Sequence, residues 1–448
     1  MATHYHRVPP GPRGIPLLGL GWRWRRDLLQ MLTALANEYG DVVLLQLPVG
    51  NRILLNHPSD IDRVLVLEQN KFQKSTFTRR ATERLLGNGL LTSEGQLWRR
   101  QRRLAQPLFQ RQRILEYAQT MVNLTLAHIE PWRDGEERDL AEEMMKLTQS
   151  IALKTLFGSE LKSEAARVGE ALGTVMRYQL NRLRSPFRLP EKWPTRSSRR
   201  AQGAYDYLDS IVYRIIAERL ADPKPGDDLL SRLINALDED GSKMSPKQLR
   251  DEIMTIFLAG HETTALALSW TWFLLTENAR TELCLQEEFR RVLGGRTPIA
   301  DDLERLPYLD AVIRESMRLY PPAYIITRTA IEPFDIAGYN FHAGTTVLMS
   351  QWVMHRSEKY FEKPLTYLPE RWLDGLADRL PPYAYFPFGG GPRRCIGQGF
   401  AQMEAALLVA TIVQRFRFLL VPGSRVVPEP LVTLRVKHGL RVTVHSQD

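Results

Sequence analysis

Hydrophobic residues follow two different repeats along the chain, and these repeats predict its secondary structure. Near the N-terminus, residues 41–47 (DVVLLQL) and 52–56 (RILLN) are apolar runs separated by Pro-Val-Gly-Asn, which is typical of a β-hairpin. Similar runs return between residues 416 and 444, separated by proline and glycine. From about residue 58 to 330, apolar positions recur with helical spacing. The pattern predicts a mainly α fold with small β-sheets in the N- and C-terminal regions.

The longest predicted helix begins at a clear start signal. Ser245 is suited to the N-cap, Pro246 to the first helical position, and Gln248 completes a capping box. The helix is predicted to run to Glu277, a length of roughly 48 Å at 1.5 Å per residue. A helix this long and this apolar is expected to form the central rod of the core.

Part of this helix, residues 253–275, is long enough to span a bilayer. However, Gly260, His261 and Glu262 lie near its middle, and a charged group at the centre of a bilayer is costly. We therefore interpret it as a buried helix and predict no membrane span.

The N-terminus lacks the charged, apolar and small-residue pattern of a signal peptide, which predicts a cytoplasmic protein.

Charge and cysteine content narrow the possible partners and compartments. The 60 Lys and Arg residues exceed the 51 Asp and Glu residues by nine, which favours an acidic protein, a nucleic acid or a membrane surface without choosing among them. The two cysteines are Cys284 and Cys395, so a disulfide framework is excluded and a reducing cytosol is indicated. A basic, proline-containing stretch at 185–200 is interpreted as a surface loop rather than a linker between domains.

The segment with the most distinctive chemistry is FPFGGGPRRCIG, residues 386–397, which precedes a helical run at 398–414. Three consecutive glycines offer no side chains for packing, so we expect them to let the backbone approach a flat group and to leave amides free. Cys395 stands just before the helix and beside two arginines, which favours its thiolate. A lone thiolate is a poor zinc site, whereas a porphyrin iron lacks only an axial ligand. The alternative, a buried structural cysteine, suits Cys284 better.

One pattern in this segment, F-x-x-G-x-R-x-C-x-G, resembles the haem-binding loop of the cytochrome P450 family. It consists of Phe388, Gly391, Arg393, Cys395 and Gly397. The resemblance implies a P450 fold that binds haem b, with Cys395 as the axial ligand of the iron. It extends from about residue 9 to the end of the chain, so we expect residues 1–448 to form a single P450 domain without a fused reductase or ferredoxin domain.

The long helix contains a second matching motif, AGHETT, at residues 259–264. Ala259 and Thr263 lie four apart and share one helix face. A threonine hydroxyl can bond to a carbonyl one turn earlier and loosen the helix, which opens a groove for dioxygen. The resemblance implies that Ala259 leaves room beside the haem, that Thr263 steadies iron-bound peroxide and that Glu262 helps to deliver protons. Considered alone, the threonines are explained as ordinary helix residues and His261 as part of the core.

A pair of charged residues, Glu315 and Arg318, matches the Glu-x-x-Arg motif of the family. The same spacing occurs elsewhere in this chain, where it is best explained by solvated helix pairs. Order distinguishes this pair, because Arg371 follows within Pro-Glu-Arg-Trp and the Cys395 segment comes later. The resemblance implies that Glu315, Arg318 and Arg371 form a buried ion network that holds the loop presenting Cys395.

Arginines are concentrated in WRRQRR at residues 98–103, a run that by itself indicates a solvated basic face or a nucleic-acid patch. The resemblance implies instead that Trp98 and Arg102, four apart on one helix face, bind a haem propionate. Arg393 and Arg328 match two further propionate-binding positions, and a guanidinium group pairs well with a carboxylate.

The remaining arginines of this run predict a protein partner. Arg99, Arg100 and Arg103 are expected to point outward beside the thiolate face. We expect this face to dock an acidic ferredoxin or flavodoxin, which receives electrons from its NAD(P)H reductase, and we expect no nucleic-acid partner.

Three apolar positions are predicted to face the substrate by their correspondence to the family: Leu91, Ala259 and Ala323. A pocket lined by these side chains favours a small hydrophobic substrate. The helices on either side of residues 185–200 are expected to form an entry lid. The HETT wording at 261–264 resembles bacterial fatty-acid hydroxylases and their relatives, which favours long-chain lipids, terpenoids or steroids.

Together these features predict a haem-thiolate monooxygenase that hydroxylates or epoxidises a hydrophobic substrate with dioxygen. One alternative is a haem-thiolate enzyme that uses peroxide directly or rearranges an oxygenated substrate. Another is a haem-based sensor or carrier. Thr263 and Glu262 favour the monooxygenase, since a proton relay is needed mainly when dioxygen is split.

Overall fold

The computed structural model describes residues 8–12, 27–47, 50–158, 164–184, 193, 195–222 and 228–447. In these ranges the α-helices are α2 (Leu28–Tyr39), α3 (Pro58–Asp62), α4 (Thr76–Leu86), α5 (Gly95–Ala105), α6 (Arg111–Leu115), α7 (Ala118–Ile129), α8 (Leu140–Phe157), α9 (Ala165–Arg184), α10 (Arg196–Ala221), α11 (Leu229–Asn235), α12 (Pro246–Thr276), α13 (Ala279–Leu293), α14 (Pro307–Leu319), α15 (Gln351–Met354), α16 (Leu376–Arg379) and α17 (Gln398–Val413). Short helical turns of other types are η1 (Arg63–Leu67), η2 (Gln69–Lys71), η3 (Gln106–Phe109), η4 (Ala300–Arg305), η5 (Pro369–Trp372) and η6 (Gly391–Arg393).

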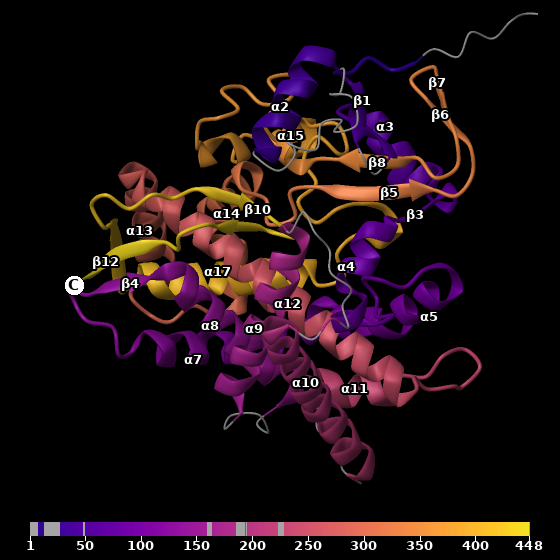
Figure 1. Ribbon diagram of the computed structural model, residues 1–448. Helices are drawn as coiled ribbons and strands as arrows, with labels where there is room; N and C mark the ends of the chain where they lie inside the picture. Colours follow the sequence, from indigo (N-terminus) through magenta and orange to yellow (C-terminus); the bar gives the residue numbers. More distant parts are fainter. Residues whose placement is uncertain are drawn as a thin grey trace, which may run out of the picture.

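The strands are β1 (Val42–Leu47), β2 (Gly50–Leu55), β3 (Phe72–Lys74), β4 (Glu137–Asp139), β5 (Ile326–Ala330), β6 (Phe334–Ile336), β7 (Tyr339–Phe341), β8 (Thr346–Met349), β9 (Phe416–Leu420), β10 (Pro428–Pro430), β11 (Leu434–Val436) and β12 (Arg441–Ser446). The prediction of a mainly α fold with small sheets is therefore confirmed. The sheets stand at opposite sides of a helical body (Figure 1).

The predicted N-terminal hairpin forms as β1 and β2, which pair antiparallel from Val42 opposite Leu55 to Leu47 opposite Gly50. It is part of a larger sheet in the order β1-β2-β8-β5-β3. Strand β8 pairs parallel with β2 and antiparallel with β5. The hydrophobic pattern did not predict β6, β7 or β8, because these are strands of three or four residues.

The long helix α12 has the predicted start. The Ser245 side chain accepts a hydrogen bond from Gln248 N–H, Gln248 reciprocates, and Pro246 occupies the first turn. The helix extends for 31 residues to Thr276, with Glu277 as its C-cap. It crosses the middle of the molecule and packs against α8, α10, α14 and α17 (Figure 1).

The two largest hydrophobic clusters of the described residues meet on α12. Its N-terminal half packs with α9, α10 and α11, whereas its C-terminal half packs with α7, α8 and α17. Within the described ranges, no helix is both long enough and apolar enough to cross a bilayer. The candidate site lies where these two clusters meet.

Candidate active site

Cys395 lies on a short loop between η6 and the N-terminus of α17. The loop folds back on itself, because Cys395 N–H donates to the carbonyl of Phe388 at 3.0 Å and Arg394 N–H donates to the carbonyl of Gly391 at 3.0 Å. Gly389 N–H closes a further turn onto Phe386 at 2.9 Å. These backbone bonds fix the direction of the Cys395 side chain.

The Cys395 side chain is deep in the protein, yet the residue keeps open surface. Burial raises the pKa of its thiol above the ordinary value, and this outweighs the opposite effects of Gly397 N–H, Arg102 and Arg394. Part of the residue is nevertheless exposed. A group that is both deep and accessible borders an internal space. The arginines therefore favour the thiolate in the predicted direction, although the effect of burial on the pKa is larger.

Two of the three glycines before Cys395 are needed for packing within the protein. A side chain on Gly390 would overlap the ring of Tyr383, and one on Gly391 would overlap the carbonyl of Leu65. Gly389 and Gly391 also have φ values of +73° and +64°, in the left-handed region. Close packing of the protein itself therefore requires Gly390 and Gly391, so the expectation that these glycines have no part in packing is wrong, while their approach to a flat group stays a prediction.

The middle of α12 contains an open patch. Ala259 is exposed and Thr263 is half-buried, although the helix on either side is buried. Phe257 belongs to one hydrophobic cluster and Ala265 to the other, so the patch lies between them. The Thr263 hydroxyl donates to the carbonyl of Ala259 at 2.7 Å. This is the back-bonded geometry that the sequence predicts for a groove.

The side chain of Glu262 points in a different direction from the side chain of its neighbour Thr263. Successive residues are rotated by about 100° on a helix. The buried Glu262 carboxylate accepts bonds from the Thr433 hydroxyl at 2.9 Å and from Arg435 Nε at 2.9 Å, both near strand β11. The structure therefore places the predicted proton donor in an ion pair with the C-terminal region, and Arg435 is a partner that the sequence did not reveal.

Three of the four predicted propionate-binding residues lie on α5 or contact it. The guanidinium group of Arg393 stacks over the ring of Trp98 at 4.3 Å and donates to the carbonyl of Ser93 at 2.9 Å. It also forms an ion pair with Glu94. Arg102 donates to the carbonyl of Arg394 at 2.9 Å, next to Cys395. The structure thus brings these three predicted residues to the same region as the thiol.

Lys74 is an additional cation of this region that the sequence motifs did not reveal. It lies opposite Arg328 in the β3–β5 pairing. Burial and the neighbouring Arg328 and Arg393 hold the pKa of Lys74 well below its usual range, and burial with Arg393 lowers the pKa of Arg328 to about 10. Glu94 is the one acidic side chain that acts electrostatically on both cations. Three half-buried basic side chains beside one carboxylate are suited to hold an anionic group.

The donor set fits haem. Cys395 could supply a sulfur ligand to the iron, and Lys74, Arg328 and Arg393 lie near Glu94 as the acidic side chain that acts on both Lys74 and Arg328. Haem has an iron that needs an axial ligand and two propionates that need cations. Ala259 leaves the surface of α12 open, as a bound porphyrin requires.

Comparison with known proteins decides the family. The family model described as cytochrome P450 matches residues 9–440. The chain belongs to the cytochrome P450 family. It is therefore an oxidoreductase of the haem-dependent monooxygenase type, as the Cys395 motif indicates.

Relatives of this P450 include several bacterial enzymes. Cyclooctatin synthase from Streptomyces melanosporofaciens is 36% identical over 97% of this chain and 95% of its own length. Pentalenene oxygenase from Streptomyces avermitilis is 32% identical over 100% of this chain and 99% of its own length. Cyclooctat-9-en-7-ol 5-monooxygenase from Streptomyces melanosporofaciens is 36% identical over 92% of this chain and 90% of its own length.

The structure brings the predicted ion network of this P450 together. Glu315 accepts from Arg318 Nε at 2.8 Å, from Arg371 Nε at 3.0 Å and from Trp372 Nε1 at 2.9 Å. Arg318 donates in addition to the carbonyl of His355 at 2.7 Å. All five side chains are buried. The carboxylate of Glu315 is therefore surrounded by three side-chain donors, and Leu368 N–H donates to it as well at 3.0 Å.

His355 connects this network to the Cys395 loop, which the sequence motifs did not reveal. Its Nε2 accepts the backbone N–H of Phe386 at 2.9 Å, at the start of the loop. Burial and the neighbouring Arg318 and Arg356 hold the pKa of His355 well below its usual range, so the ring is neutral. The network therefore acts on the loop through a backbone carbonyl and an imidazole.

The predicted substrate residues all keep open surface. Leu91 is 40% exposed, Ala259 is exposed and Ala323 is half-buried. The predicted lid corresponds to α9 and α10, which pack against each other, while residues 185–192 and 194 lie outside the described residues. The roles of these residues and of the lid stay predictions.

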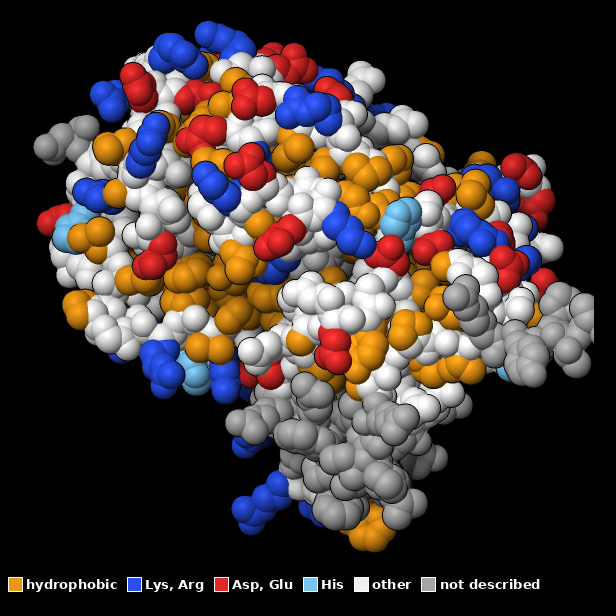
Figure 2. All heavy atoms as spheres, turned by 90° about the horizontal axis from the view of Figure 1, so that it is seen from above, with side chains coloured by type: hydrophobic (Ala, Val, Ile, Leu, Met, Phe, Trp, Pro, Cys, Tyr) orange, Lys and Arg blue, Asp and Glu red, His pale blue; other side chains and the backbone are white. Residues whose placement is uncertain are grey.

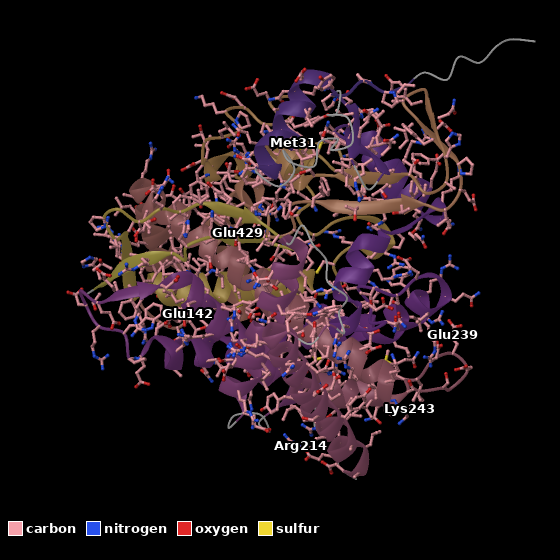
Figure 3. The ribbon with its side chains drawn as sticks, in the orientation of Figure 1. Met31, Glu142, Arg214, Glu239, Lys243 and Glu429 are labelled. Atoms are coloured by element: carbon pink, nitrogen blue, oxygen red, sulfur yellow. The ribbon has the colours of Figure 1, made fainter. Side chains whose placement is uncertain are left out.

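The arginines predicted to point outward do so only in part. Arg100 Nε and Arg103 Nη2 donate to Asp238 at 2.8 and 2.9 Å, and Arg103 is also paired with Glu239. Figure 3 shows Glu239 and Lys243 on the loop between α11 and α12. This loop lies beside α5, so acidic groups offset part of the basic face. Arg99 and Arg394 are exposed and lack a carboxylate partner among the described contacts.

Charge is also mixed elsewhere on the surface. On the face in Figure 2, the coloured Lys and Arg side chains are interspersed with Asp and Glu side chains and with apolar atoms. The excess of nine positive charges is therefore not gathered into one continuous patch on the described part of that face.

Glu404 is a further titratable group that the sequence motifs did not reveal. It lies on α17, nine residues after Cys395, and burial raises its pKa to about 8, against a hydrogen bond with Thr264 that lowers it. The carboxyl group is therefore mostly neutral at pH 7. A glutamate within an apolar helical run is the signal that could have drawn attention to it.

Proposed function

We propose that this P450 uses haem b, dioxygen and electrons from a separate redox protein to hydroxylate or epoxidise a hydrophobic substrate in the cytoplasm. The observation that carries this proposal is the Thr263 hydroxyl, held at 2.7 Å from the carbonyl of Ala259 on the open patch of α12. A hydroxyl group in this place is of use when dioxygen is split, because the oxygen atom that leaves as water requires two protons.

Bound haem would supply the iron at which dioxygen is activated, with a thiolate ligand that favours O–O cleavage. Cys395 provides the sulfur, while Arg102, Arg328, Arg393 and Lys74 hold the propionates. The hydroxyl group of Thr263 would hold a proton donor in the groove of α12 beside Ala259. For Glu262 to supply protons there, its carboxylate has to exchange a bond from Arg435 for one from water.

A coupled assay tests this function. We expect product to form with NADPH, a surrogate ferredoxin and its reductase, and NADPH consumption to match product formation. Turnover with hydrogen peroxide alone, and none with the electron-transfer proteins, supports the peroxide-using alternative and contradicts the proposal.

Thr263→Ala is expected to uncouple electron use from product formation. The variant removes the hydroxyl that steadies the proton supply, so more NADPH is expected to end as released hydrogen peroxide, with product per NADPH falling about a hundredfold, the lower end of the range of general acid–base catalysis. NADPH, product and peroxide are measured in the same reaction.

Ser269→Ala is the matched control for this variant. Its hydroxyl makes the same type of bond on the same helix, to the carbonyl of Ala265 at 2.7 Å, but it is buried in the core. Coupling should stay at the wild-type level in this control. Unchanged coupling in Thr263→Ala would falsify the proton-relay role of Thr263.

The substrate is proposed to be a terpenoid. Leu91, Ala259 and Ala323 offer apolar surface, and relatives are named for pentalenene and cyclooctat-9-en-7-ol. Terpenes, fatty acids and steroids can be compared by the spectral change that accompanies displacement of water from the iron. A spectral response to fatty acids alone would overturn the terpenoid proposal.

The redox partner is proposed to be an acidic ferredoxin or flavodoxin that docks near Arg99 and Arg394. Association is expected to weaken several-fold as ionic strength rises from about 0.05 to 0.2 M, because the attraction of exposed charges is screened. Stopped-flow reduction measures this rate. A rate that is independent of salt excludes electrostatic docking.

Charge reversal locates the docking face. Arg99→Glu is expected to slow association, whereas Arg441→Glu is the control. Arg441 is exposed on β12, which pairs with β9 beyond the C-terminal end of α17, while Cys395 precedes the N-terminal end of that helix.

A further inference from the structure

The segment of residues 87–91, between α4 and α5, is held against α12 by two consecutive carboxyl groups. Asn88 N–H donates to Asp251 Oδ2 at 2.9 Å, and Leu90 N–H donates to Glu252 Oε2 at 3.0 Å. Both acidic residues are buried. Two backbone amides of the 87–91 segment therefore depend on α12 for their acceptors.

Two glycines permit this close contact. A side chain on Gly87 would overlap the carboxylate of Asp251, and one on Gly89 would overlap the hydroxyl of Thr255. Gly87 also has a φ of +51°, where larger residues are strained. The segment consequently lies directly on the surface of the helix.

The other side of the 87–91 segment is bound to α5. Gln101 Nε2 donates to the carbonyl of Asn88 at 2.7 Å, and the Ser93 hydroxyl donates to Gln101 Oε1 at 2.5 Å. Gln101 is fully buried and neighbours Arg102 on the helix that also bears Trp98. The segment is therefore fixed between α12 and the helix of the proposed propionate site.

The acceptors on α12 share a face with the open patch. Glu252, Thr255, Ala259 and Thr263 are spaced by three, four and four residues, which places them along one side of the helix. Glu252 is about 10 Å from Ala259 along the axis. Leu91 follows Leu90 directly and is among the exposed hydrophobic residues. The position of the segment thus determines where Leu91 lies relative to the open patch.

Other polar atoms at the contact between the 87–91 segment and α12 do not add hydrogen bonds to it. Oε1 of Glu252 and the hydroxyl of Thr255 are buried and have no hydrogen-bond partner among the described residues. Burial raises the pKa of Glu252 to about 8, so its side chain is mostly neutral at pH 7. An uncharged glutamine can therefore take its place with an acceptor for Leu90 N–H.

We propose that Asp251 and Glu252 are positioning residues that hold the 87–91 segment, and with it Leu91, as one wall of the substrate space. They act through the segment and set how well a bulky ligand fits. This inference rests on the proposed function, because it takes the space beside Ala259 and Cys395 as the place where substrate binds.

Two iron ligands of different size test the inference in the haem-loaded protein. Imidazole and 4-phenylimidazole are titrated spectrally into wild type, Glu252→Ala and Glu252→Gln. In Glu252→Ala we expect Kd for 4-phenylimidazole to rise about fivefold, the effect of one lost hydrogen bond, with Kd for imidazole unchanged. Glu252→Gln is expected to behave as wild type.

Hydrogen exchange reports on the segment independently of the ligands. The peptide containing residues 87–91 is expected to exchange faster in Glu252→Ala than in wild type or Glu252→Gln. Lys247→Ala is the control, since it removes the ion pair at 3.2 Å between the exposed Lys247 and the buried Asp251 and leaves the amide bonds in place. If Glu252→Ala does not retain haem, Gly89→Ala tests the same contact by separating the segment from Thr255.

The outcomes separate the two proposals. Faster exchange without any change in 4-phenylimidazole affinity overturns the inference, because the segment is then not a wall of the ligand space. Equal weakening of both ligands also overturns it, since this indicates general damage to the haem site. Neither result depends on turnover, so a failed coupled assay contradicts the proposed function and leaves this test intact.

Discussion

Cys395→Ser is expected to abolish monooxygenase activity and to remove the spectral signature of thiolate ligation from the ferrous carbonyl complex. A serine oxygen is a much weaker electron donor to iron than a thiolate, and electron donation from sulfur favours O–O cleavage. Activity should fall to background, and haem content should decrease because the propionate contacts alone remain. The measurements are haem content, the difference spectrum with carbon monoxide, and product formation.

The chain offers a matched control for this variant in its other cysteine. Cys284 is half-buried on α13, where it packs against the hydrophobic cluster around α17. Cys284→Ser is expected to keep the wild-type spectrum and activity. If Cys395→Ser keeps the same carbonyl spectrum as wild type, the sulfur of Cys395 is not the ligand, and every proposal based on it is withdrawn.

Glu315→Gln is expected to destabilise the protein by about 3–5 kcal/mol, the usual cost of leaving a buried charge without its partner. The substitution preserves the shape of the side chain but removes the anion that Arg318 and Arg371 share at 2.8 and 3.0 Å. Because Arg318 also bonds the carbonyl of His355, and His355 bonds the Cys395 loop, haem retention should fall as well. Chemical denaturation and haem content measure the two effects.

Asp310→Asn is the control on the same helix. Asp310 forms an ion pair with Arg314 at 2.5 Å, but both side chains are partly exposed, so its loss should cost less than about 1 kcal/mol. If the two variants lose similar amounts of stability, the buried Glu315 network stabilises the protein no more than an exposed ion pair does, and the prediction is wrong. A normal stability of Glu315→Gln with loss of haem locates its role in the loop rather than in the fold.

Features encoded by neighbouring residues could be predicted from the sequence. The capping box of Ser245 and Gln248, the β1–β2 hairpin and the back-bonded Thr263 all appear in the structure as predicted. Each depends on contacts within about four residues or across one tight turn. The Cys395 loop is also local, which is why a ten-residue pattern was enough to indicate the family.

Contacts between distant segments could not be predicted in this way. Lys74 meets Arg328 because two short strands pair, Glu262 meets Arg435 because β11 lies against α12, and Arg100 meets Asp238 across a loop. The same holds for Gly390, whose missing side chain makes room for Tyr383. In each case the sequence showed one partner and no sign of the other.

The sequence by itself determined the class of this protein: a mainly helical chain of the cytochrome P450 family, with the family's motif around one cysteine and with an alcohol and an acid on its longest helix. Tertiary structure alone decided which charges are paired, which glycines serve packing, and where the 87–91 segment lies on α12. The physical reason is the separation along the sequence between the residues that interact. Caps, turns and helix faces are set by adjacent residues, whereas buried ion pairs and close backbone contacts exist only after distant parts of the chain have packed together.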